Sequence, residues 1–490
     1  MPEYIRALIV ILALATVVFF FAKTPATAVA IAPDDFVRRR NAWLYITLAG
    51  FLSQNFWVFV AIVSIVIYNA AKKDTNKIAL FFFLLLALPQ VKEEIPGFAG
   101  IRYFLVVDYV RVLTMILLLP VCLDARRFAV SQRNKAHSAD IVLATYILLN
   151  LALQAQYDVA TNVVRAGLNW VIDVVIPYYA ISRSIKDLQA FRDVLMSFVV
   201  AAMLASLVGV FEFTRNWILY KSLGQALGAV WDPGYLARGD YLRASATSGQ
   251  SIVFGFVVAI AIGLYLFLRH AVPNRIQYVS GIALLLAGIL SPLSRGPWVG
   301  LVAMLIIYTA LGEKPIQKYF KYSVLVVPMI FVIAISDFGK KIIDYLPFVG
   351  SVDADNVTYR QNLFETSVQI ILDNPFFGSS DYLLRMEDLR QGQGIIDLVN
   401  TFLIVGLNSG FVGLVLYLLV FGLSIWGVFK RMKQDVSDSV LHKLGQSLIA
   451  VMLGILVIIA TVSPIYHVPL MLWSVTALCL AYRRLGIDVS

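Results

Sequence analysis

The chain has 490 residues, of which 60% are hydrophobic and only 14% are charged. A soluble globular domain carries roughly 25% charged residues, so this composition excludes an ordinary soluble protein and predicts a multi-pass helical membrane protein. The net charge of +10 fits basic loops in such a protein and does not by itself indicate a nucleic-acid partner. Cys122 and Cys479 stand alone in apolar segments, which predicts neither a disulfide framework nor a metal cluster.

Apolar segments along the whole chain predict about fourteen membrane spans. They are 4–22, 43–69, 76–90, 103–123, 139–157, 160–181, 194–213, 250–268, 276–292, 297–312, 322–336, 399–429, 446–462 and 468–482. The first is longer than a signal-peptide core and has no clean cleavage site, so we expect a retained helix. The third is short enough to be re-entrant or tilted, and the twelfth is long enough to be kinked or to begin outside the bilayer.

The basic loops set the expected orientation. Under strict alternation, seven basic segments fall on one face: 71–77, 124–138, 182–192, 269–275, 313–321, 430–443 and 482–486. Lysine and arginine concentrate in cytoplasmic loops, so this face and both termini are expected in the cytoplasm. The long polar segments 214–250 and 337–398 are then expected on the outer face.

We expect four successive parts in the chain. They are N-terminal membrane helices over 1–193, further membrane helices over 194–336, an outer loop subdomain over 337–398 and C-terminal membrane helices over 399–490. The second part includes the outer loop 214–249 and a Ser-Arg-Gly turn. The third is too long for a simple connector. Its stretch 359–378 predicts an amphipathic helix that ends at Asn374-Pro375.

Most of the basic residues outside the cytoplasmic loops are arginines. They are Arg38, Arg39, Arg40, Arg102, Arg111, Arg165, Arg215, Arg238, Arg243, Arg295, Arg360, Arg385 and Arg390. The planar guanidinium binds phosphate oxygens bidentately, which a lysine cannot do. As a set, these arginines predict a site for a phosphate-bearing ligand. For any single arginine, solvation or an ion pair with Asp232, Asp240, Glu365 or Asp381 is the alternative.

Arg295 lies in the stretch "SPLSRGPWVG" between two apolar segments. Gly296 permits close approach of backbone or ligand, and Pro297 suits the first turn of the following helix. The N–H groups at that helix's N-terminus favour an anion. The stretch therefore predicts a tight turn at the outer face, with Arg295 at an anion site.

A second pair of charges lies within one apolar span. Arg165 and Asp173 are separated by a little over two helical turns and share a face. Charges inside a membrane indicate a functional site. A buried structural ion pair is the alternative, and the sequence leaves both open.

Four stretches in order resemble the O-antigen ligase and polysaccharide polymerase family of bacterial inner membranes. They are "RASATSGQSIVFG" (243–255), "SRGPWVGL" (294–301), "YRQNLFETSVQIILDNPFFG" (359–378) and "VNTFLIVGLNSGFVGLVLYLLV" (399–420). Their order, spacing and shared outer placement make the resemblance specific over about residues 195–480. The first 190 residues are similar only in having many helices.

The resemblance implies an all-α bundle of about 12–14 helices, the large all-helical (GT-C type) glycosyltransferase architecture. It implies an undecaprenyl-diphosphate-linked oligosaccharide as donor at the periplasmic face, with no metal or cofactor and with inversion at the anomeric carbon. Arg243 and Arg295 would hold the diphosphate, and Arg360 would bind diphosphate or glycan. A chain-length regulator and a flippase of the same pathway are the expected partners beside the bilayer.

One departure from the family concerns the acceptor-activating base. Ligases of the family carry a histidine before Asn-Thr, where this chain has Val399, followed by Asn400. Asp397 is the nominated substitute, because a carboxylate partly screened from water has a raised pKa; a helix N-terminal carboxylate is its alternative role. Glu365 is a second candidate, with a simple ion pair as its alternative. His467, an outer histidine, is a third, with an interfacial role as its alternative.

The missing histidine favours a polysaccharide polymerase over a ligase that transfers glycan to lipid A core or protein. A lipid-linked-glycan flippase or solute transporter is the alternative from another class, and Arg111, Arg165 and Asp173 are the residues that support it. A transporter of this kind is expected to show inverted repeats, which the sequence does not display. A receptor or scaffold would leave the outer arginines without a role.

Overall fold

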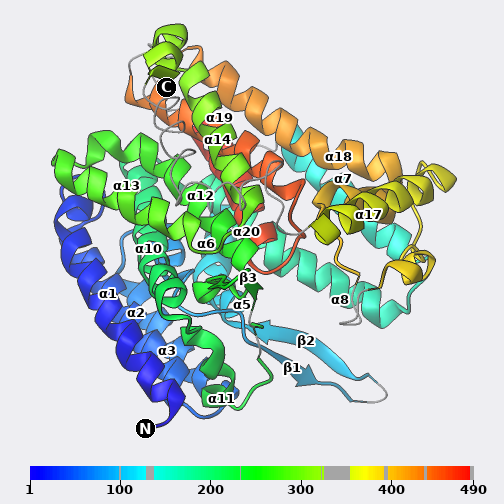
Figure 1. The fold of residues 1–490 in the computed structure, drawn as a ribbon, viewed down its shortest axis with the longest axis horizontal. Helices are drawn as coiled ribbons and strands as arrows, with labels where there is room; N and C mark the ends of the chain where they lie inside the picture. The colour runs from blue at the N-terminus through cyan, green and yellow to red at the C-terminus, as the bar shows by residue number, and fades with distance from the viewer. Residues whose placement is uncertain are drawn as a thin grey trace. The chain divides into compact units, whose positions relative to one another are not determined.

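The computed structural model describes residues 1–98, 101–127, 137–231, 233–234, 236–321, 323–324, 354–390, 396–434 and 439–485. Over these residues the fold is all-α, with two short antiparallel β-hairpins (Figure 1). Six helices in the described residues are long and apolar enough to cross a membrane, namely Glu3–Thr27, Phe56–Lys73, Leu188–Arg215, Ser251–Ala271, Thr401–Met432 and Val440–Ile459. The chain is therefore a multi-pass membrane protein, and the predicted all-helical class is confirmed.

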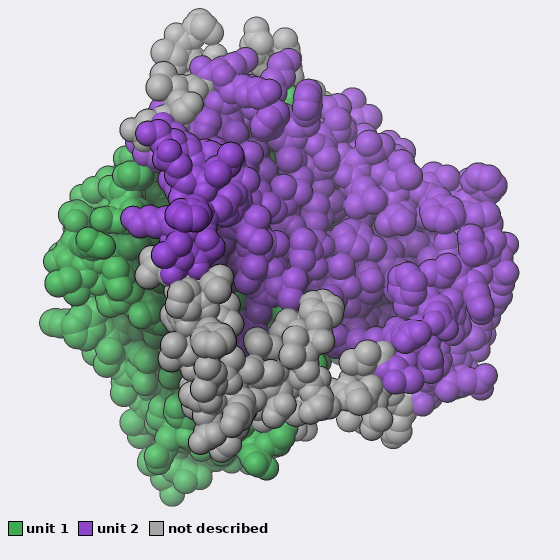
Figure 2. All heavy atoms as spheres, turned by 45° about the horizontal axis from the view of Figure 1, so that its top comes forward, with its two compact units in different colours: residues 1–135, 168–297, 465–490 green, residues 136–167, 298–464 purple. Residues whose placement is uncertain are grey.

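The chain forms two compact units, each built from separate stretches of sequence (Figure 2). Unit 1 contains residues 1–135, 168–297 and 465–490, and unit 2 contains residues 136–167 and 298–464. Two helices pass from one unit to the other along the chain, α8 (Ala160–Trp170) and α14 (Arg295–Ala310). The four successive parts expected from the sequence stay a prediction.

Unit 1 is a helical bundle whose longest helix is α10 (Leu188–Arg215). Its other helices are α1 (Glu3–Thr27), α2 (Pro33–Leu52), α3 (Phe56–Lys73), α4 (Lys77–Leu84), α5 (Tyr109–Leu113), α6 (Leu119–Arg127), α9 (Ile176–Ser184), α11 (Leu223–Leu227), α12 (Ser251–Phe267), α13 (Arg275–Leu290) and α20 (His467–Arg483). Its strands are β1 (Lys92–Pro96), β2 (Tyr103–Asp108), β3 (Ala237–Arg238) and β4 (Tyr241–Leu242), paired β1 with β2 and β3 with β4.

Several short helical turns complete unit 1. The π-helical turns are η1 (Thr114–Leu118) and η3 (Val171–Val175), and the 3₁₀ turns are η4 (Leu219–Ser222), η5 (Ala246–Ser248) and η6 (Leu268–Ala271). The two π-helical turns fall inside the predicted spans 103–123 and 160–181. Each widens a helix by one hydrogen-bonded residue without breaking it.

A helical hairpin occupies the place where the sequence predicted one long span over 43–69. The helices α2 and α3 are separated by a break in which Gln54 has a left-handed φ of 52°. Asn55 caps α3, because its side-chain oxygen accepts from two backbone N–H groups of the first turn at 2.9 and 3.1 Å. The single predicted span is therefore wrong, and α2 begins ten residues earlier, among charged residues.

The charged start of α2 is stabilised by a buried ion cluster. Arg39 is 0% exposed and donates to both carboxylate oxygens of Asp74 at 2.8 Å. It also contacts Asp193 at 2.5 Å and the hydroxyl of Ser197 at 2.8 Å. A buried charge is tolerated only when it is fully paired. This cluster therefore allows the start of α2, whose charges predicted a loop, to form a helix.

The two ends of unit 1 are defined by the residues at the two ends of α10. We call the end that holds Arg39, Asp74 and Asp193 the Asp74 end, and the end that holds Glu212 and Arg243 the Arg243 end. The 28 residues of α10 connect the two ends over about 42 Å at the usual helical rise.

The helix α1 runs antiparallel to α10. Trp217, which follows α10 at the Arg243 end, donates through its indole N–H to Glu3 at 3.1 Å. Gln189, at the other end of α10, donates to the backbone oxygens of Val29 and Ala30 at 2.8 and 3.0 Å. The N-terminus therefore lies at the Arg243 end, and the connection between α1 and α2 lies at the Asp74 end.

This placement corrects the expected alternation. The basic loop 71–77 lies at the Asp74 end, opposite to the N-terminus, whereas strict alternation placed both on one face. The error arises because α2 was taken for a loop, and it affects only the residues before Phe56. Arg38, Arg39 and Arg40 consequently lie with the basic loops and do not belong to the set at the Arg243 end.

Unit 2 contains α7 (Ser138–Gln154), α17 (Ala354–Asp373), η7 (Leu384–Leu389), α18 (Thr401–Met432) and α19 (Val440–Ile459). The predicted amphipathic helix is confirmed as α17, which ends directly before Asn374-Pro375. Its apolar face packs with η7 and the start of α18 around a buried cluster of Leu363, Ile370, Ile371, Met386, Leu398 and Leu407. The described part of the loop 337–398 is therefore ordered by its own core.

The helix α18 has the predicted kink, at Gly410, with φ 58° and ψ −162°. The N–H groups of Phe411 and Val412 donate across the kink to the carbonyl oxygens of Pro375 and Phe376 at 2.7 and 3.3 Å. A Cβ at Gly410 would lie 2.4 Å from the Phe376 backbone. The third and fourth family-like stretches are therefore locked together through main-chain contacts.

Candidate functional site

The first two family-like stretches meet at the Arg243 end of unit 1. The N–H of Arg243 donates to Leu236 at 2.9 Å, and the N–H of Ala244 donates to Ser291 at 3.2 Å. The Arg243 side chain then donates through Nε to the Pro292 carbonyl at 3.1 Å and through Nη2 to the Ser294 hydroxyl at 3.0 Å. The main chain of Ala244 and the side chain of Arg243 thus both hold the turn at residues 291–294.

A second arginine braces the same turn. Arg238 donates through Nη1 to the carbonyl oxygen of Leu293. Leu293 has a left-handed φ of 48°, which is costly for a branched side chain and persists only where surrounding contacts hold it. Two guanidinium groups on consecutive carbonyls supply such contacts. We call residues 291–295, with Arg238 and Arg243, the arginine-braced turn.

Arg295 leaves the arginine-braced turn as the first residue of α14. It is half-buried, and the turn places it beside the first N–H groups of the helix. Pro297 lies two residues further along, against Gly255 of α12, where a Cβ would come within 2.9 Å of the proline ring. The predicted tight turn that presents Arg295 is therefore confirmed in its geometry, and its anion-binding role stays a prediction.

Glu212, which the sequence pattern did not single out, holds the other side of the segment that carries Arg243. Glu212 is fully buried in the last turn of α10. One carboxylate oxygen accepts from the N–H groups of Ser245 and Ala246 at 3.1 and 2.8 Å, and the other accepts from Leu219 at 3.0 Å. A lone Glu near the end of an apolar helix was the available signal.

Glu212 acts on Arg243 through the backbone. Leu242 donates its N–H to the side chain of Asn216 at 3.4 Å, so the N–H groups from residue 242 through residue 246 all have an acceptor. Three of these five N–H groups donate to residues on or just beyond the end of α10, one donates to the arginine-braced turn, and that of Arg243 donates to Leu236. Such a frame holds the backbone on both sides of Arg243 in one conformation.

Unit 2 brings together two other predicted site residues. Tyr359, beside Arg360 on α17, accepts through its hydroxyl from the N–H of Asp397 at 3.2 Å. Arg360 and Asp397 are both exposed. Partial burial raises the pKa of the Asp397 carboxyl above its usual value, and the nearby positive charge of Arg360 pulls that pKa down. Among the described residues, Asp397 with Arg360 nearby comes nearest to the environment expected for the acceptor-activating base.

Asn400 and Glu365 have local structural partners. The Asn400 side-chain oxygen caps α18 by accepting from Phe402 and Leu403 N–H at 2.9 and 3.2 Å. Glu365 is exposed on α17 and accepts from Gln361 one turn earlier at 3.0 Å. These contacts agree with structural roles, and the catalytic hypotheses for both residues stay predictions.

His467 is the first residue of α20 in unit 1 and is 0% exposed. Tyr466, just before it, has a left-handed φ of 49° and lies edge-on against Trp231 with ring centroids 6.3 Å apart. A ring with no exposed surface has no direct access to a substrate in this conformation. The described geometry therefore favours a packing role for His467.

The alternative that Arg165 and Asp173 form a structural ion pair is wrong, because Asp173 pairs with Arg111. Both Asp173 oxygens accept from the Arg111 guanidinium, at 2.9 and 2.6 Å, within unit 1. Arg111 also donates to the Val106 carbonyl at 2.6 Å. Arg165 belongs to unit 2 and donates to Asn162 at 2.7 Å. Two of the three charged residues that supported a transporter, Arg111 and Asp173, thus form a bidentate ion pair.

Other predicted outer arginines form surface ion pairs. Arg390 contacts Glu387 at 2.7 Å, and Arg385 contacts Asp373. Among the alternative partners, Asp232 lies outside the described residues. No cluster of three or more His, Cys, Asp or Glu side chains in the described parts of the chain is placed to hold a metal ion.

Residues 280–418 match the family model described as O-antigen ligase. The matched range includes Arg295, Arg360 and Asp397, and it leaves out Arg243 and His467. The resemblance inferred from the four stretches is therefore confirmed over this range. No curated protein matches the chain.

Proposed function

We propose that this chain is a polysaccharide polymerase, which transfers an O-antigen or exopolysaccharide chain from an undecaprenyl-diphosphate donor to a lipid-linked repeat unit. The observation that carries the proposal is the arginine-braced turn, which holds Arg295 at the start of α14. Its support is the match of residues 280–418 to the O-antigen ligase family, which acts in membranes on lipid-linked oligosaccharide.

The proposed chemistry divides among four residues. Arg243 and Arg295 bind the diphosphate and stabilise the negative charge that develops as it leaves, and Arg360 binds diphosphate or glycan. Asp397 accepts the proton of the acceptor hydroxyl, whose oxygen bonds to the anomeric carbon. The bond between that carbon and the diphosphate breaks, and its electron pair leaves with undecaprenyl diphosphate. Direct displacement inverts the anomeric configuration, and the reaction needs no metal.

The proposed setting is the bacterial inner membrane. Basic side chains gather at the Asp74 end, including Lys72, Lys73 and Lys77, so this end belongs in the cytoplasm. The Arg243 end then belongs in the periplasm, where the lipid-linked substrates are presented. In this orientation the N-terminus is periplasmic. The end of α20 is cytoplasmic, because Arg484 donates to the Ser182 carbonyl at 2.9 Å close to the loop 182–192.

A ligase is the second candidate, and the description of the matching family favours it. It would use the same donor and transfer the glycan to lipid A core or to a protein. The position occupied by Val399 separates the two, since the ligase-type histidine is absent there. A flippase or transporter is the candidate from another class, and the Arg111–Asp173 ion pair weakens its support.

One reconstitution separates these candidates. Purified protein in detergent receives lipid-diphosphate repeat units alone, with a chelator present, and the products are resolved by glycan length. A ladder of longer glycans is expected for a polymerase. If products form only when a second acceptor is added, the protein is a ligase and not a polymerase. Movement of the lipid-linked unit in vesicles without any new glycosidic bond would overturn both enzyme functions.

A further inference from the structure

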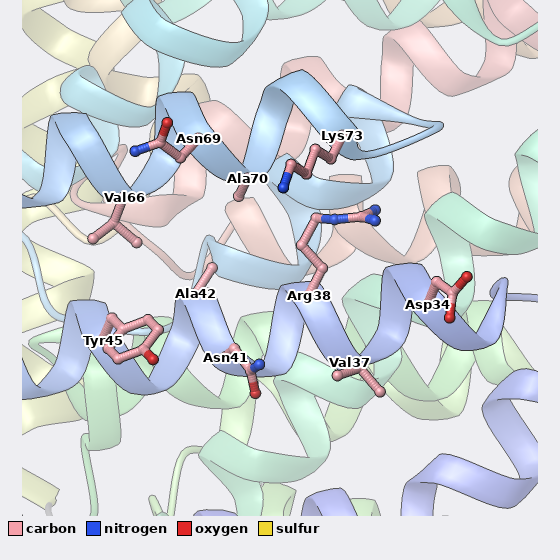
Figure 3. Close-up of a pocket in the computed structure, with 10 residues that line it drawn as sticks. All are labelled: Asp34, Val37, Arg38, Asn41, Ala42, Tyr45, Val66, Asn69, Ala70 and Lys73. Atoms are coloured by element: carbon pink, nitrogen blue, oxygen red, sulfur yellow. The ribbon is translucent and has the colours of Figure 1, made fainter.

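A groove lies between α2 and α3 (Figure 3). Its lining residues Arg38 and Lys73 adjoin Arg39 and Asp74 at the Asp74 end of unit 1, opposite to the arginine-braced turn. Its volume is about 620 Å³. Ten described residues line it: Asp34, Val37, Arg38, Asn41, Ala42, Tyr45, Val66, Asn69, Ala70 and Lys73. Figure 3 shows the side chains of Arg38 and Lys73 reaching into the gap between the two helices.

The chemistry of the groove changes along its length. Asp34, Arg38 and Lys73 lie at its mouth, and Tyr45 and Val66 lie further along the two antiparallel helices. From residue 34 to residue 45 the helix α2 rises about 16 Å. That length exceeds the polar interfacial layer, which is roughly 5–8 Å deep on each side of a bilayer. The lining of the groove therefore changes from charged to apolar over about the same distance as a phospholipid changes from its headgroup to its acyl chains.

The apolar end continues onto exposed aliphatic side chains. Ile62 and Val58 follow Val66 at intervals of four residues on α3 and are 40% and 49% exposed. Tyr45 on α2 is 59% exposed. Because α3 is apolar enough to span the membrane, this stripe faces acyl chains. A ligand with its polar head at the mouth would lay its tail along the stripe.

The charges at the mouth indicate which headgroup fits. Arg38 is held in place by an ion pair with the buried Asp35, and its side chain is 25% exposed. Two cations, Arg38 and Lys73, thus meet two carboxylates, Asp35 and Asp34, so the mouth is close to neutral. Asp34 precedes Arg38 by one helical turn on the same face. A phosphate joined by a short linker to an ammonium group matches this arrangement better than a net anion does.

We infer that the groove between α2 and α3 binds one zwitterionic aminophospholipid, with its phosphate on Arg38 and Lys73 and its ammonium group on Asp34. In the proposed orientation this lipid belongs to the cytoplasmic leaflet. The site is independent of the transfer reaction, since none of its residues belongs to the arginine-braced turn or to unit 2. Basic pockets between membrane helices bind phospholipid headgroups by the same physics.

The test is native mass spectrometry of the purified protein with phosphatidylethanolamine or phosphatidylglycerol of identical acyl chains. The wild type is expected to retain one phosphatidylethanolamine in preference to phosphatidylglycerol. Lys73→Ala is expected to reduce this retention about tenfold, the loss of about 1.4 kcal/mol expected for one charge-assisted contact. The double variant with Arg38→Ala loses both phosphate contacts and is expected to retain less lipid still. Lys72→Ala is the matched control, because Lys72 is adjacent, stacks on Tyr68 and does not line the groove.

A second variant tests the ammonium contact. Asp34→Asn is expected to keep lipid binding and to shift the preference toward phosphatidylglycerol. Thermal midpoints of all variants confirm that they are folded. Equal retention by wild type and Lys73→Ala, or a wild-type preference for phosphatidylglycerol, would overturn the assignment. Displacement of the lipid by millimolar inorganic phosphate would show an anion site in place of a lipid site.

Discussion

Substituting Glu212 by Gln tests the frame that holds Arg243. The carboxylate accepts three backbone N–H groups, at 2.8, 3.0 and 3.1 Å, and has no exposed surface. A glutamine keeps one acceptor oxygen. This oxygen still accepts from Ser245 and Ala246 when it takes the position of Oε2, the carboxylate oxygen that accepts two hydrogen bonds. The amide nitrogen of the glutamine then faces the N–H of Leu219, and two donors cannot bond to each other.

The expected cost follows from this count. One buried N–H left without an acceptor costs about 1–3 kcal/mol. Glu212→Gln is therefore expected to lower the free energy of unfolding by about that amount, and Glu212→Ala by about 3 kcal/mol or more because all three groups lose their acceptor. Turnover should fall further than the loss of folded protein explains, because the backbone on either side of Arg243 loosens.

The assay combines thermal unfolding in detergent with turnover on lipid-linked repeat units. Glu387→Gln is the control, since Glu387 is an exposed carboxylate paired with Arg390, and its replacement should change stability by no more than about 0.5 kcal/mol. If Glu212→Gln unfolds at the same temperature as the wild type and turns over at the wild-type rate, Glu212 does not hold the backbone around Arg243.

Three further predictions follow from the same structure. Arg295→Ala should remove most turnover without loss of expression, and Arg295→Lys should restore little of it because the bidentate fork is lost; near-normal turnover in Arg295→Ala would exclude this side chain from the reaction. If Asp397 is the base, turnover is lost as pH falls through its raised pKa, and in the residual activity of Arg360→Ala this acidic limb should move to higher pH because the charge that lowers the pKa is gone; an unmoved limb would contradict the pairing. Gly410→Ala should strongly destabilise the protein, since a Cβ meets the Phe376 backbone at 2.4 Å, whereas Gly422→Ala in the same helix meets nothing within 4 Å and should be neutral or slightly stabilising; equal thermal midpoints would show that the kink is not required.

Composition and periodicity predicted the helical class, the helix that ends at Asn374-Pro375 and the kink in α18. These features follow from local chemistry, since a proline ends a helix and a glycine permits a left-handed φ. The hairpin of α2 and α3 was not predicted, because the charges at the start of α2 read as a loop. They form a helix only because Asp74 and Asp193, distant in sequence, surround Arg39. Hydropathy carries no information about such a long-range pairing.

The candidate site divides in the same way. The sequence predicted the turn that presents Arg295 from Gly296 and Pro297, which lie in the first turn of α14. The residue with the left-handed φ is Leu293, which the pattern did not indicate. The sequence could not predict that Arg238 donates to the Leu293 carbonyl or that Glu212 accepts from the N–H of residue 245. Nor could it predict that Asp173 pairs with Arg111. Each of these depends on which helices pack together. A motif locates a residue, whereas the partners of that residue come from the fold.

The most direct test of the central claim is a count of bonds made and lipid diphosphate released. Purified protein is given only lipid-linked repeat units, and both the new glycosidic linkages and the free undecaprenyl diphosphate are measured over time. A polymerase predicts one undecaprenyl diphosphate released for each linkage formed, with both absent in Arg295→Ala. Linkages without release, release without linkages, or no reaction until a different acceptor is added would contradict the account.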